Sequence, residues 1–356
     1  MRHLLLALLL GSLLGGQSST SYSWQSTDLD RDGIPDGLEQ MLLERFLPTF
    51  HVSRGDCDVA PSRFAEGEPN PTPVGRDGTI YGQALPVTRK SGQVGIELHY
   101  YHLWAKDCGR LSHALDVEYV AALVEPNWAE PASDLASAVS RESQPWEWAA
   151  VYWFAAGHQS TVCDVSHATR APTLIAEHRG PEVWIATGKH ASYLSQERCK
   201  FGCGGDTCPN MAPVKVNRIV NVGEMEAPMN GAVWTASPRW PFRAKMISQF
   251  SEANVQRIES SKPGSMIAAN EALPPVRATI LAGGETLDGV ATGSKHTGEA
   301  LKTGKKSTGN AVGVAAESTG KAILKSLRAV KQTLGGEEKS AGSQTATATS
   351  ASQENP

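Results

Sequence analysis

The sequence predicts a mainly β protein whose core is an antiparallel β-sandwich with short helices at its periphery. Between Phe50 and Phe250, apolar runs rich in Val, Ile, Tyr and Trp alternate with Gly, Pro and Asn, which is typical of strands separated by turns. Many short strands of this kind favour a sandwich of antiparallel sheets. All nine Trp residues lie between Trp24 and Trp240, so we expect the core in the first two-thirds of the chain.

The N-terminus has the features of a secretory signal peptide. A basic start (Arg2 and His3) precedes an apolar stretch over residues 4–14 and then small residues, and this stretch is too short to span a bilayer. We expect residues 1–19 to be removed. No later stretch of the sequence is long and apolar enough to cross a membrane. We therefore expect a secreted protein, either extracellular or periplasmic.

Residues 20–49 combine an acidic loop with a helix. In DLDRDGIPDGLE the acidic residues occupy positions one, three, five, nine and twelve, and Gly33 occupies position six. This is the spacing of an EF-hand-type calcium loop, in which the seventh residue contributes its backbone carbonyl. The predicted Ca²⁺ ligands are Asp28, Asp30, Asp32, Ile34, Asp36 and Glu39. The alternative is an acidic turn that only caps the helix.

The predicted helix follows the loop directly. Leu38, Leu42 and Phe46 belong to an apolar stripe that ends before Pro48, as expected for a helix that buries one face. The segment before the loop is a poor helix former. The motif therefore resembles the single-loop calcium sites of thrombospondin type 3 repeats and dockerins more than a paired EF-hand.

Residues 50–260 form the predicted β-rich domain. The runs that read as strands are 78–87, 94–104, 116–124, 147–156, 182–188 and 214–223. The run over 147–156 is apolar enough to be a buried helix instead. The expected helices are short, with 135–140 and 251–258 as the candidates.

The strand around SHALDVEYV carries a second candidate metal site. Asp116 and Glu118 share one face because strand side chains alternate, and His113 lies at the strand entry. One nitrogen and two carboxylates suit Mg²⁺, Mn²⁺ or Ca²⁺. Asp107 adds a further oxygen if Cys108 is tethered nearby. The alternative is that the acids are solvated and the histidine is incidental.

Cysteine usage favours disulfides. An even number of cysteines in an exported chain predicts pairing, and six allow fifteen connectivities that the sequence does not resolve. The candidates are Cys57, Cys108, Cys163, Cys199, Cys203 and Cys208. The run CKFGCGGDTC predicts a stapled loop, with a structural zinc site as the alternative.

The segment 261–356 is rich in Ala, Gly, Ser, Thr and Lys. Within residues 292–335, TGEAL, TGNAV and TGKAI recur every eleven residues, which is three helical turns. Two interpretations stay open: a disordered tail, or a basic helix that contacts an anionic membrane surface. The net charge of −4 gives no electrostatic case for nucleic acid.

Between Ile96 and Ser195 the chain resembles the Vps62-like family (vacuolar protein sorting-associated protein sixty-two). In that family a strand with an Asp-Trp-Glu triplet is followed by a polar stretch with His and then a His-Ala-Ser-Tyr box. Here the corresponding segments are SHALDVEY, GHQSTVCD around His158, and GKHASYLS with His190 and Tyr193. His158, His190 and Tyr193 are therefore candidates for the edge of a site. The alternative is that His190 and Tyr193 only satisfy buried backbone groups at a turn. The family has no established activity to transfer.

A weaker resemblance connects the chain with necrosis-inducing-protein-like secreted cytolysins. Their signature heptapeptide contains H-x-x-D-x-E, and they are β-sandwiches that hold a divalent cation near a membrane-lipid site. The resemblance implies His113, Asp116 and Glu118 as ligands, with Asp107 in addition. Val117 stands where both families favour Trp, which weakens the toxin interpretation more than the metal interpretation.

Three functional hypotheses follow from the sequence. The first is a secreted, metal-binding module for a polar ligand such as a glycan or a lipid headgroup. The second is a metal-dependent hydrolase with His113, His158 or His190 as general base or acid. The third is a membrane-active protein whose tail contacts the bilayer. No Gly-x-Ser-x-Gly elbow and no HExxH helix occur in the sequence, so common hydrolase classes find no support.

Overall fold

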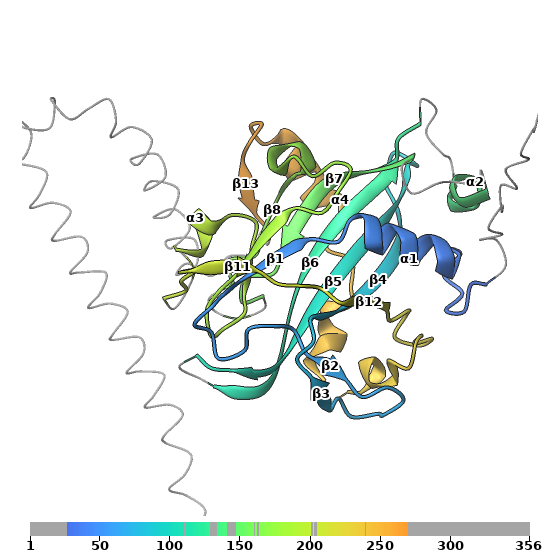
Figure 1. Ribbon diagram of the computed structural model, residues 1–356. Helices are drawn as coiled ribbons and strands as arrows, with labels where there is room; N and C mark the ends of the chain where they lie inside the picture. Colours follow the sequence, from blue (N-terminus) through green and yellow to red (C-terminus); the bar gives the residue numbers. More distant parts are fainter. Residues whose placement is uncertain are drawn as a thin grey trace, which may run out of the picture. The chain divides into compact units, whose positions relative to one another are not determined.

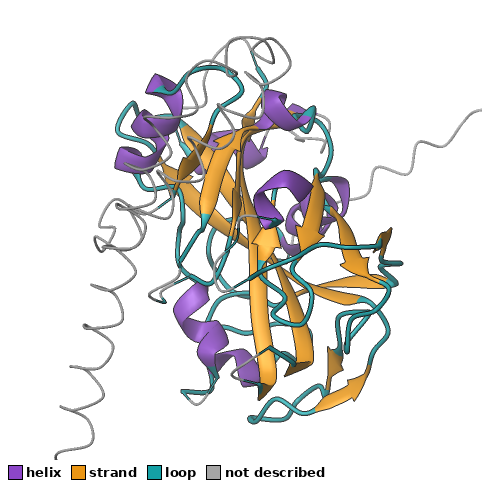
Figure 2. Ribbon diagram, turned by 90° about the vertical axis from the view of Figure 1, so that its left-hand side faces the viewer, coloured by secondary structure: helices purple, strands orange, loops and turns teal. Residues whose placement is uncertain are grey.

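The computed structural model describes residues 27–269 apart from short gaps, which are 110–111, 129–133, 141–146, 160, 162–163, 201, 203–204 and 239. The described part is mainly β, as predicted, with short helices around the strands (Figure 1, Figure 2). It belongs to the first of two compact units, Met1–Gly284. The predicted signal peptide and the eleven-residue repeats lie outside the described residues.

A seven-stranded sheet forms the centre of this unit. In spatial order its strands are β12 (Arg218–Asn221), β4 (Thr79–Thr88), β5 (Val94–Asp107), β6 (His113–Pro126), β7 (Trp148–Ala155), β8 (His167–Arg170) and β13 (Met266–Ala268). All neighbouring pairs are antiparallel except β12 and β4, which are parallel. β5 and β6 form a long hairpin. Two residues of the predicted strand site, Asp107 and His113, lie opposite each other at its turn.

A four-stranded sheet faces one side of the central sheet. In spatial order its strands are β10 (Ser192–Tyr193), β9 (Glu182–Ile185), β1 (Thr49–Ser53) and β11 (Met211–Pro213). β1 and β9 are parallel, so each of the two sheets contains a parallel pair. The predicted antiparallel pairing holds for the other neighbours in these sheets, whereas β9 and β12 lie beside strands of the same direction, which long connections allow. A separate pair consists of β2 (Arg63–Phe64) and β3 (Pro73–Gly75).

The first hydrophobic core lies between the two sheets and helix α1 (Asp36–Arg45). Even-numbered side chains of the hairpin, such as Tyr100 and Val120, point into it because strand side chains alternate between faces. Phe50 of β1 and Leu42 of α1 complete this core. Ile34 of the acidic loop and the apolar face of α1 therefore belong to the same core as the strands. The domain bounds predicted at residues 20–49 stay a prediction.

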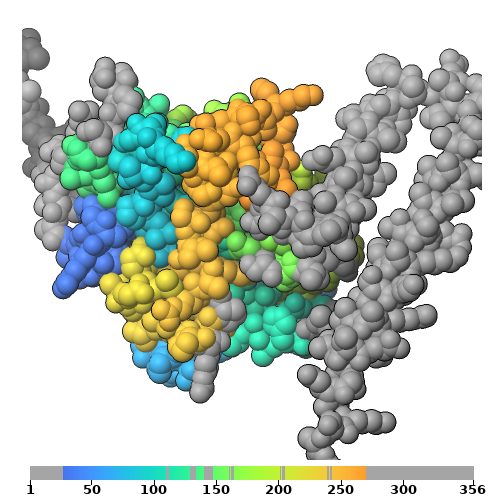
Figure 3. Space-filling view, turned by 180° about the vertical axis from the view of Figure 1, so that it is seen from behind, coloured from blue at the N-terminus to red at the C-terminus, as the bar shows by residue number. Residues whose placement is uncertain are grey.

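A second core covers the other face of the central sheet. Odd-numbered side chains, such as Tyr101 and Tyr119, pack there against Trp234 and Phe250. The covering segment contains η3 (Val233–Ala236), η4 (Pro241–Lys245) and α4 (Glu252–Ser260), and in the view from behind it runs over this face in yellow to orange (Figure 3). This third layer explains why β5 and β6 are apolar on both sides.

The β-rich unit extends beyond the boundary predicted at residue 260. β13 pairs with β8, with Met266 opposite Thr169, and the amide of Ala269 donates to the carbonyl of Ser166 (2.9 Å). Residues 261–269 therefore belong to the sheet and not to the tail.

The predicted elements are largely confirmed. All six predicted runs contain strands, including the run over 147–156, although the last run is a strand only at β12. Helices α2 (Leu135–Ser140) and α4 match the expected helices, while α3 (Gln196–Cys199) and η2 (Ala171–Leu174) were not predicted. The strands that sequence reasoning missed have five residues or fewer.

Candidate metal centre and polar cluster

The acidic loop and the first turns of α1 converge on one centre. Carboxylate oxygens of Asp28, Asp30 and Asp32 lie within 4.8 Å of one another, and so do those of Asp30, Asp36 and Glu39. Asp30 belongs to both groups. The spacing read from the sequence thus corresponds to one three-dimensional cluster of five carboxylates.

Backbone amides hold the loop in this shape. Gly33 turns the chain with a φ of 92°, in the left-handed region that favours glycine. Its amide donates to Asp28 Oδ2 (3.1 Å), and the amide of Ile34 donates to Asp32 Oδ1 (2.7 Å). In Asp28 and Asp32, these bonds use one carboxylate oxygen and leave the other oxygen for a further contact.

Several oxygens of this cluster are buried without a hydrogen-bond partner among the described residues. They are both carboxylate oxygens of Asp30, Oδ2 of Asp32 and Oε1 of Glu39. Asp30 is 6 % exposed and Glu39 is 0 % exposed. Burying a carboxylate without a partner is costly unless the group binds a cation or a proton.

The pKa values of these acids reflect their burial. Loss of hydration, together with the charges of neighbouring carboxylates, raises the pKa of Asp30 to about 7 and that of Glu39 to about 9. Loss of hydration also raises the pKa of Asp32 to about 6. The cluster repels added negative charge and favours a bound cation.

Sequence reasoning missed one acid beside this cluster. Glu224 follows β12, and burial, with Asp32 and Asp30 next in effect, raises its pKa to about 7. Its position near the loop depends on the contact between β12 and α1 (Figure 1). No spacing rule within the sequence indicates such a contact.

The strand site has a different geometry from the one predicted. No three of its four residues place ligand atoms within 4.8 Å of one another in the described structure. His113 is exposed and lies 3.6 Å from Asp107, measured between Nε2 and Oδ2. Asp116 and Glu118 each have a basic partner instead, so metal binding at this strand stays a prediction.

His190 is the partner of Asp116. Its Nδ1 lies 3.1 Å from Asp116 Oδ2, and its ring stacks on Trp104 with 4.1 Å between centroids. The imidazole is fully buried. Burial alone would raise the pKa of Asp116, but the hydrogen bond and the charge of His190 hold that pKa below its usual range.

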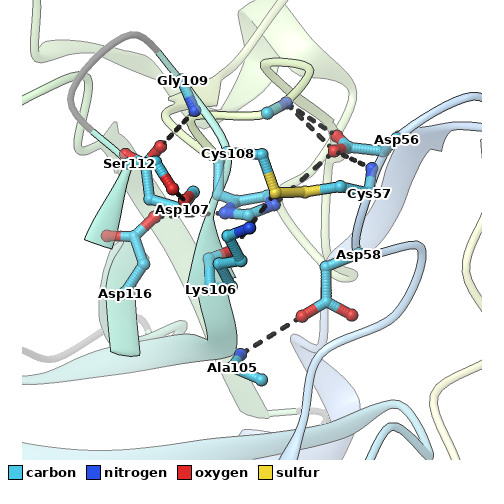
Figure 4. The surroundings of a disulfide bond; sticks show 12 residues. Asp56, Cys57, Asp58, Ala105, Lys106, Asp107, Cys108, Gly109, Ser112 and Asp116 are labelled. Carbon is cyan, nitrogen blue, oxygen red and sulfur yellow. Dashed lines mark hydrogen bonds and ion pairs between the residues drawn. A yellow bond between two sulfur atoms is a disulfide. The ribbon is translucent and has the colours of Figure 1, made fainter. Parts of the chain in front are cut away.

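The other nitrogen of His190 has no hydrogen-bond partner among the described residues, and it lies 3.9 Å from Asp56 Oδ1. The loop that carries Asp56 is joined to the β5–β6 turn by the disulfide Cys57–Cys108. Asp56 and Asp58 lie on one side of this disulfide, with Asp107 and Asp116 on the other (Figure 4). Because Cys57 is oxidised, its sulfur is not available as a thiolate ligand beside His190.

Lys245 is the partner of Glu118. Its ammonium donates to Glu118 Oε2 (3.1 Å) and to the carbonyl of Val117. Val120 is the first residue of β6 that pairs with β7. Val117 and Glu118 precede it, so Lys245 lies at a part of the β6 edge that does not pair with β7. Burial raises the pKa of Glu118 to about 7, although Lys245 acts in the opposite direction.

A further ion-pair network lies around Asp206, which sequence reasoning also missed. Asp206 accepts from His158 (2.7 Å), from Lys189 (3.0 Å) and from the hydroxyl of Tyr193. Burial opposes ionisation of both partners, but their mutual contact raises the pKa of His158 and lowers that of Asp206. We call the residues Asp116, Glu118, His158, Lys189, His190, Asp206 and Lys245 the polar cluster.

The stapled loop positions Asp206. Cys199 and Cys208 form a disulfide, which confirms the stapled loop and not the zinc alternative for these two residues. Cys163 and Cys203 lie outside the described residues. The predicted edge residues His158, His190 and Tyr193 all belong to or contact the polar cluster.

A buried Ser–His contact lies next to the cluster. His102 Nε2 is 2.8 Å from Ser192 Oγ, and its Nδ1 accepts a hydrogen bond from the indole of Trp104 (2.9 Å). Burial lowers the pKa of His102 to about 3. A neutral imidazole oriented by an indole donor and not by a carboxylate lacks the third member of a catalytic triad.

No protein-family model, no curated protein and no solved structure matches the chain. Within the described residues, no helix has the length and apolar character that a membrane span requires.

Proposed function

We propose that the protein is an exported calcium-binding β-sandwich that serves as a binding module for a polar ligand, such as a glycan or a lipid headgroup. Its calcium site consists of the predicted loop ligands, with the carbonyl of Ile34 as the seventh-position oxygen. The resemblance to the Vps62-like family stays a prediction beside this proposal.

The observation that supports calcium binding is the set of buried carboxylate oxygens without partners. Asp30 offers two such oxygens, and Asp32 and Glu39 offer one each. Hard cations take oxygen ligands, and Ca²⁺ accepts six to eight of them in flexible geometry. A single acidic residue suffices to cap a helix, so the capping alternative leaves the buried oxygens unexplained.

The polar cluster supports a polar ligand. It combines acids and bases close together, and the side chains of His158, Lys189 and Lys245 retain 16–19 % exposure. A glycan hydroxyl or a phosphate-bearing headgroup would exchange hydrogen bonds with these partly exposed donors. Calcium would contribute by holding the loop and α1 on the first core, and the ligand would bind at the hairpin end of the sheet.

Calorimetric titration of the full chain with Ca²⁺ tests the metal site. Wild type should bind Ca²⁺, and Asp30→Asn should lose this binding because it removes a charge shared by both carboxylate groups. Glu197→Gln is the control, since Glu197 is an acid elsewhere on the surface with a side chain that is 73 % exposed. Equal binding by all three proteins would overturn the assignment.

A metal-dependent hydrolase is the second candidate. It is favoured by the 3.1 Å contact between His190 and Asp116, which places an imidazole next to a predicted metal ligand, as a general base requires. Hydrolysis of ester, phosphodiester and glycoside substrates should be measured with Mn²⁺ added. Activity that is lost in both His190→Asn and Asp116→Asn, in protein that remains folded, would support the hydrolase over the binding module.

A further inference from the structure

The turn after β12 lies directly against the acidic loop. Gly223 has a φ of 65°, and a Cβ atom at this position would lie 3.2 Å from Asp30 Oδ2. The amide of Val222 donates to the carbonyl of Gly82, and that of Met229 donates to Val222 (both 2.8 Å). These bonds fix the backbone on both sides of Glu224.

Glu224 follows this turn and has one carboxylate oxygen in a hydrogen bond and one without. Its Oε2 accepts from the side-chain amide of Gln83 (3.2 Å), while its Oε1 is buried without a hydrogen-bond partner among the described residues. Gln83 is itself fully buried on β4 and also donates to the carbonyl of Gly223 (3.1 Å). The hydrogen bond from Gln83 therefore restrains the Glu224 carboxylate next to the turn that lies against Asp30.

Glu39, a member of the cluster, has the same arrangement of its two oxygens. Its Oε2 accepts from the side-chain amide of Asn221 on β12 (2.7 Å), and its Oε1 is buried without a partner. Each of the two glutamates thus has one oxygen fixed by an amide of the central sheet and one oxygen unpaired. Outer hydrogen bonds of this kind orient carboxylates that bind a metal.

We propose that Glu224 is a further ligand of the calcium site, so that the cation is shared between the loop and the central sheet. This inference rests on the proposed calcium site. The cluster would then include a carboxylate contributed by the sheet as well as those of the loop. Such a large, irregular oxygen set suits Ca²⁺ better than Mg²⁺, which demands near-ideal octahedral geometry and keeps several waters.

A shared cation makes the order of one sheet edge dependent on calcium. β12 is one of the two edge strands of this sheet, and among the described strands it pairs with β4 alone. Without a cation, Glu224 and the loop acids repel one another across the contact between β12 and the loop. With Ca²⁺ bound, the same groups join α1, β12 and β4. Calcium would therefore stabilise the sheet edge as well as the loop.

The experiment compares Glu224→Gln with Glu226→Gln in the full chain, using Ca²⁺ alone as the probe. Glu226 lies two residues away, and its side chain is 78 % exposed. We expect Glu224→Gln to weaken Ca²⁺ affinity roughly tenfold or more, and Glu226→Gln to leave it within about twofold. Hydrogen exchange should show that Ca²⁺ slows exchange in residues 218–229 of wild type but not of Glu224→Gln.

The outcomes separate the two proposals. If Glu224→Gln binds Ca²⁺ as wild type does and keeps the slowed exchange of β12, the shared site is wrong while the loop site stands. If wild type binds no Ca²⁺, both proposals fail. Glu224→Gln should melt no lower than wild type in chelator, because glutamine keeps the contact with Gln83 and removes a repelling charge. A lower melting temperature in chelator would contradict the proposal.

Discussion

Two kinds of buried acid occur among the described residues, those with a basic partner and those without. Asp116 and Asp206 have basic partners, and their pKa values are held below the usual range. Asp30 and Glu39 have none, and burial raises their pKa values to about 7 and about 9. Glu118 shows that the direction of the pKa shift alone does not separate the two kinds, because burial raises its pKa to about 7 although Lys245 is its partner. What favours a cation at the loop is that Asp30 and Glu39 are buried with no basic partner among the described residues.

The ion pair between His158 and Asp206 predicts a pH dependence. The raised pKa of His158 means that its stabilisation is complete below its ordinary value of 6.5 and is lost as the pH rises through the folded value. The lowered pKa of Asp206 means that its stabilisation is complete above 3.8 and is lost as the pH falls through the folded value. Both contributions are therefore complete between about pH 4 and 6.5.

His158→Gln should lower the free energy of unfolding by on the order of 1 kcal/mol at pH 5.5, and this difference should shrink as the pH rises above 6.5. Urea unfolding of both proteins across pH 5–9 measures it. A difference that grows with pH would show that His158 acts in its neutral form.

Single residues also show how far the sequence predicted the site. The spacing of Asp28 to Glu39 predicted the loop cluster because its ligands are local in the chain. Glu224 and Asp206 escaped prediction because they reach their partners through the docking of β12 and through a disulfide-closed loop. Contacts made by tertiary structure leave no periodic signal in a single sequence.

At the scale of elements, length decided which strands were predictable. The long runs of β4, β5, β6 and β7 carry enough apolar residues to identify them, whereas β10 and β2 have two residues each. Short strands of this kind are defined by the strand beside them and not by their own propensity. The parallel pairing of β1 with β9 depends in the same way on long-range packing.

The first residues of β6 provide a test of the strand site. If Asp116 serves mainly as the partner of His190, Asp116→Asn should lower the free energy of unfolding by about 1–3 kcal/mol in chelator, because it removes a charge-assisted hydrogen bond from a buried imidazole. Thermal unfolding with chelator, and then with Mg²⁺, Mn²⁺ or Ca²⁺, measures it. Glu197→Gln is again the control.

The contrary result would favour the metal site on this strand. In that case Asp116→Asn would match wild type in chelator and would lose only the stabilisation that a divalent cation gives. The sequence predicted this second outcome, whereas the contacts of His190 and Lys245 favour the first.

At the scale of the whole molecule, the central sheet is enclosed by segments from both ends of the described chain. α1 and the four-stranded sheet cover one face, and the segment that contains η3, η4 and α4 covers the other. The composition placed the core in the first two-thirds of the chain, but the second core extends further, with Phe250, Val255, Ile258 and Ala269. It did not indicate that the chain then returns to the central sheet as the edge strand β13, because that strand has three residues.

A truncation series tests this boundary. A chain that ends at Ser260 loses β13 and its pairing with β8, and should lose at least about 1 kcal/mol of stability, which corresponds to roughly 2–4 °C in melting temperature for a domain of this size. A chain that ends at Gly284 should melt as the full chain does. Equal melting temperatures for both truncations would show that β13 contributes little.

The calcium content of the protein tests the central claim most directly. The full chain should be equilibrated with micromolar Ca²⁺, desalted and analysed for calcium, alongside Asp30→Asn and Glu197→Gln. We expect at least about one Ca²⁺ per chain for wild type and for Glu197→Gln, and close to none for Asp30→Asn. Wild type without calcium, or Asp30→Asn with as much as wild type, would contradict a cation held by the loop.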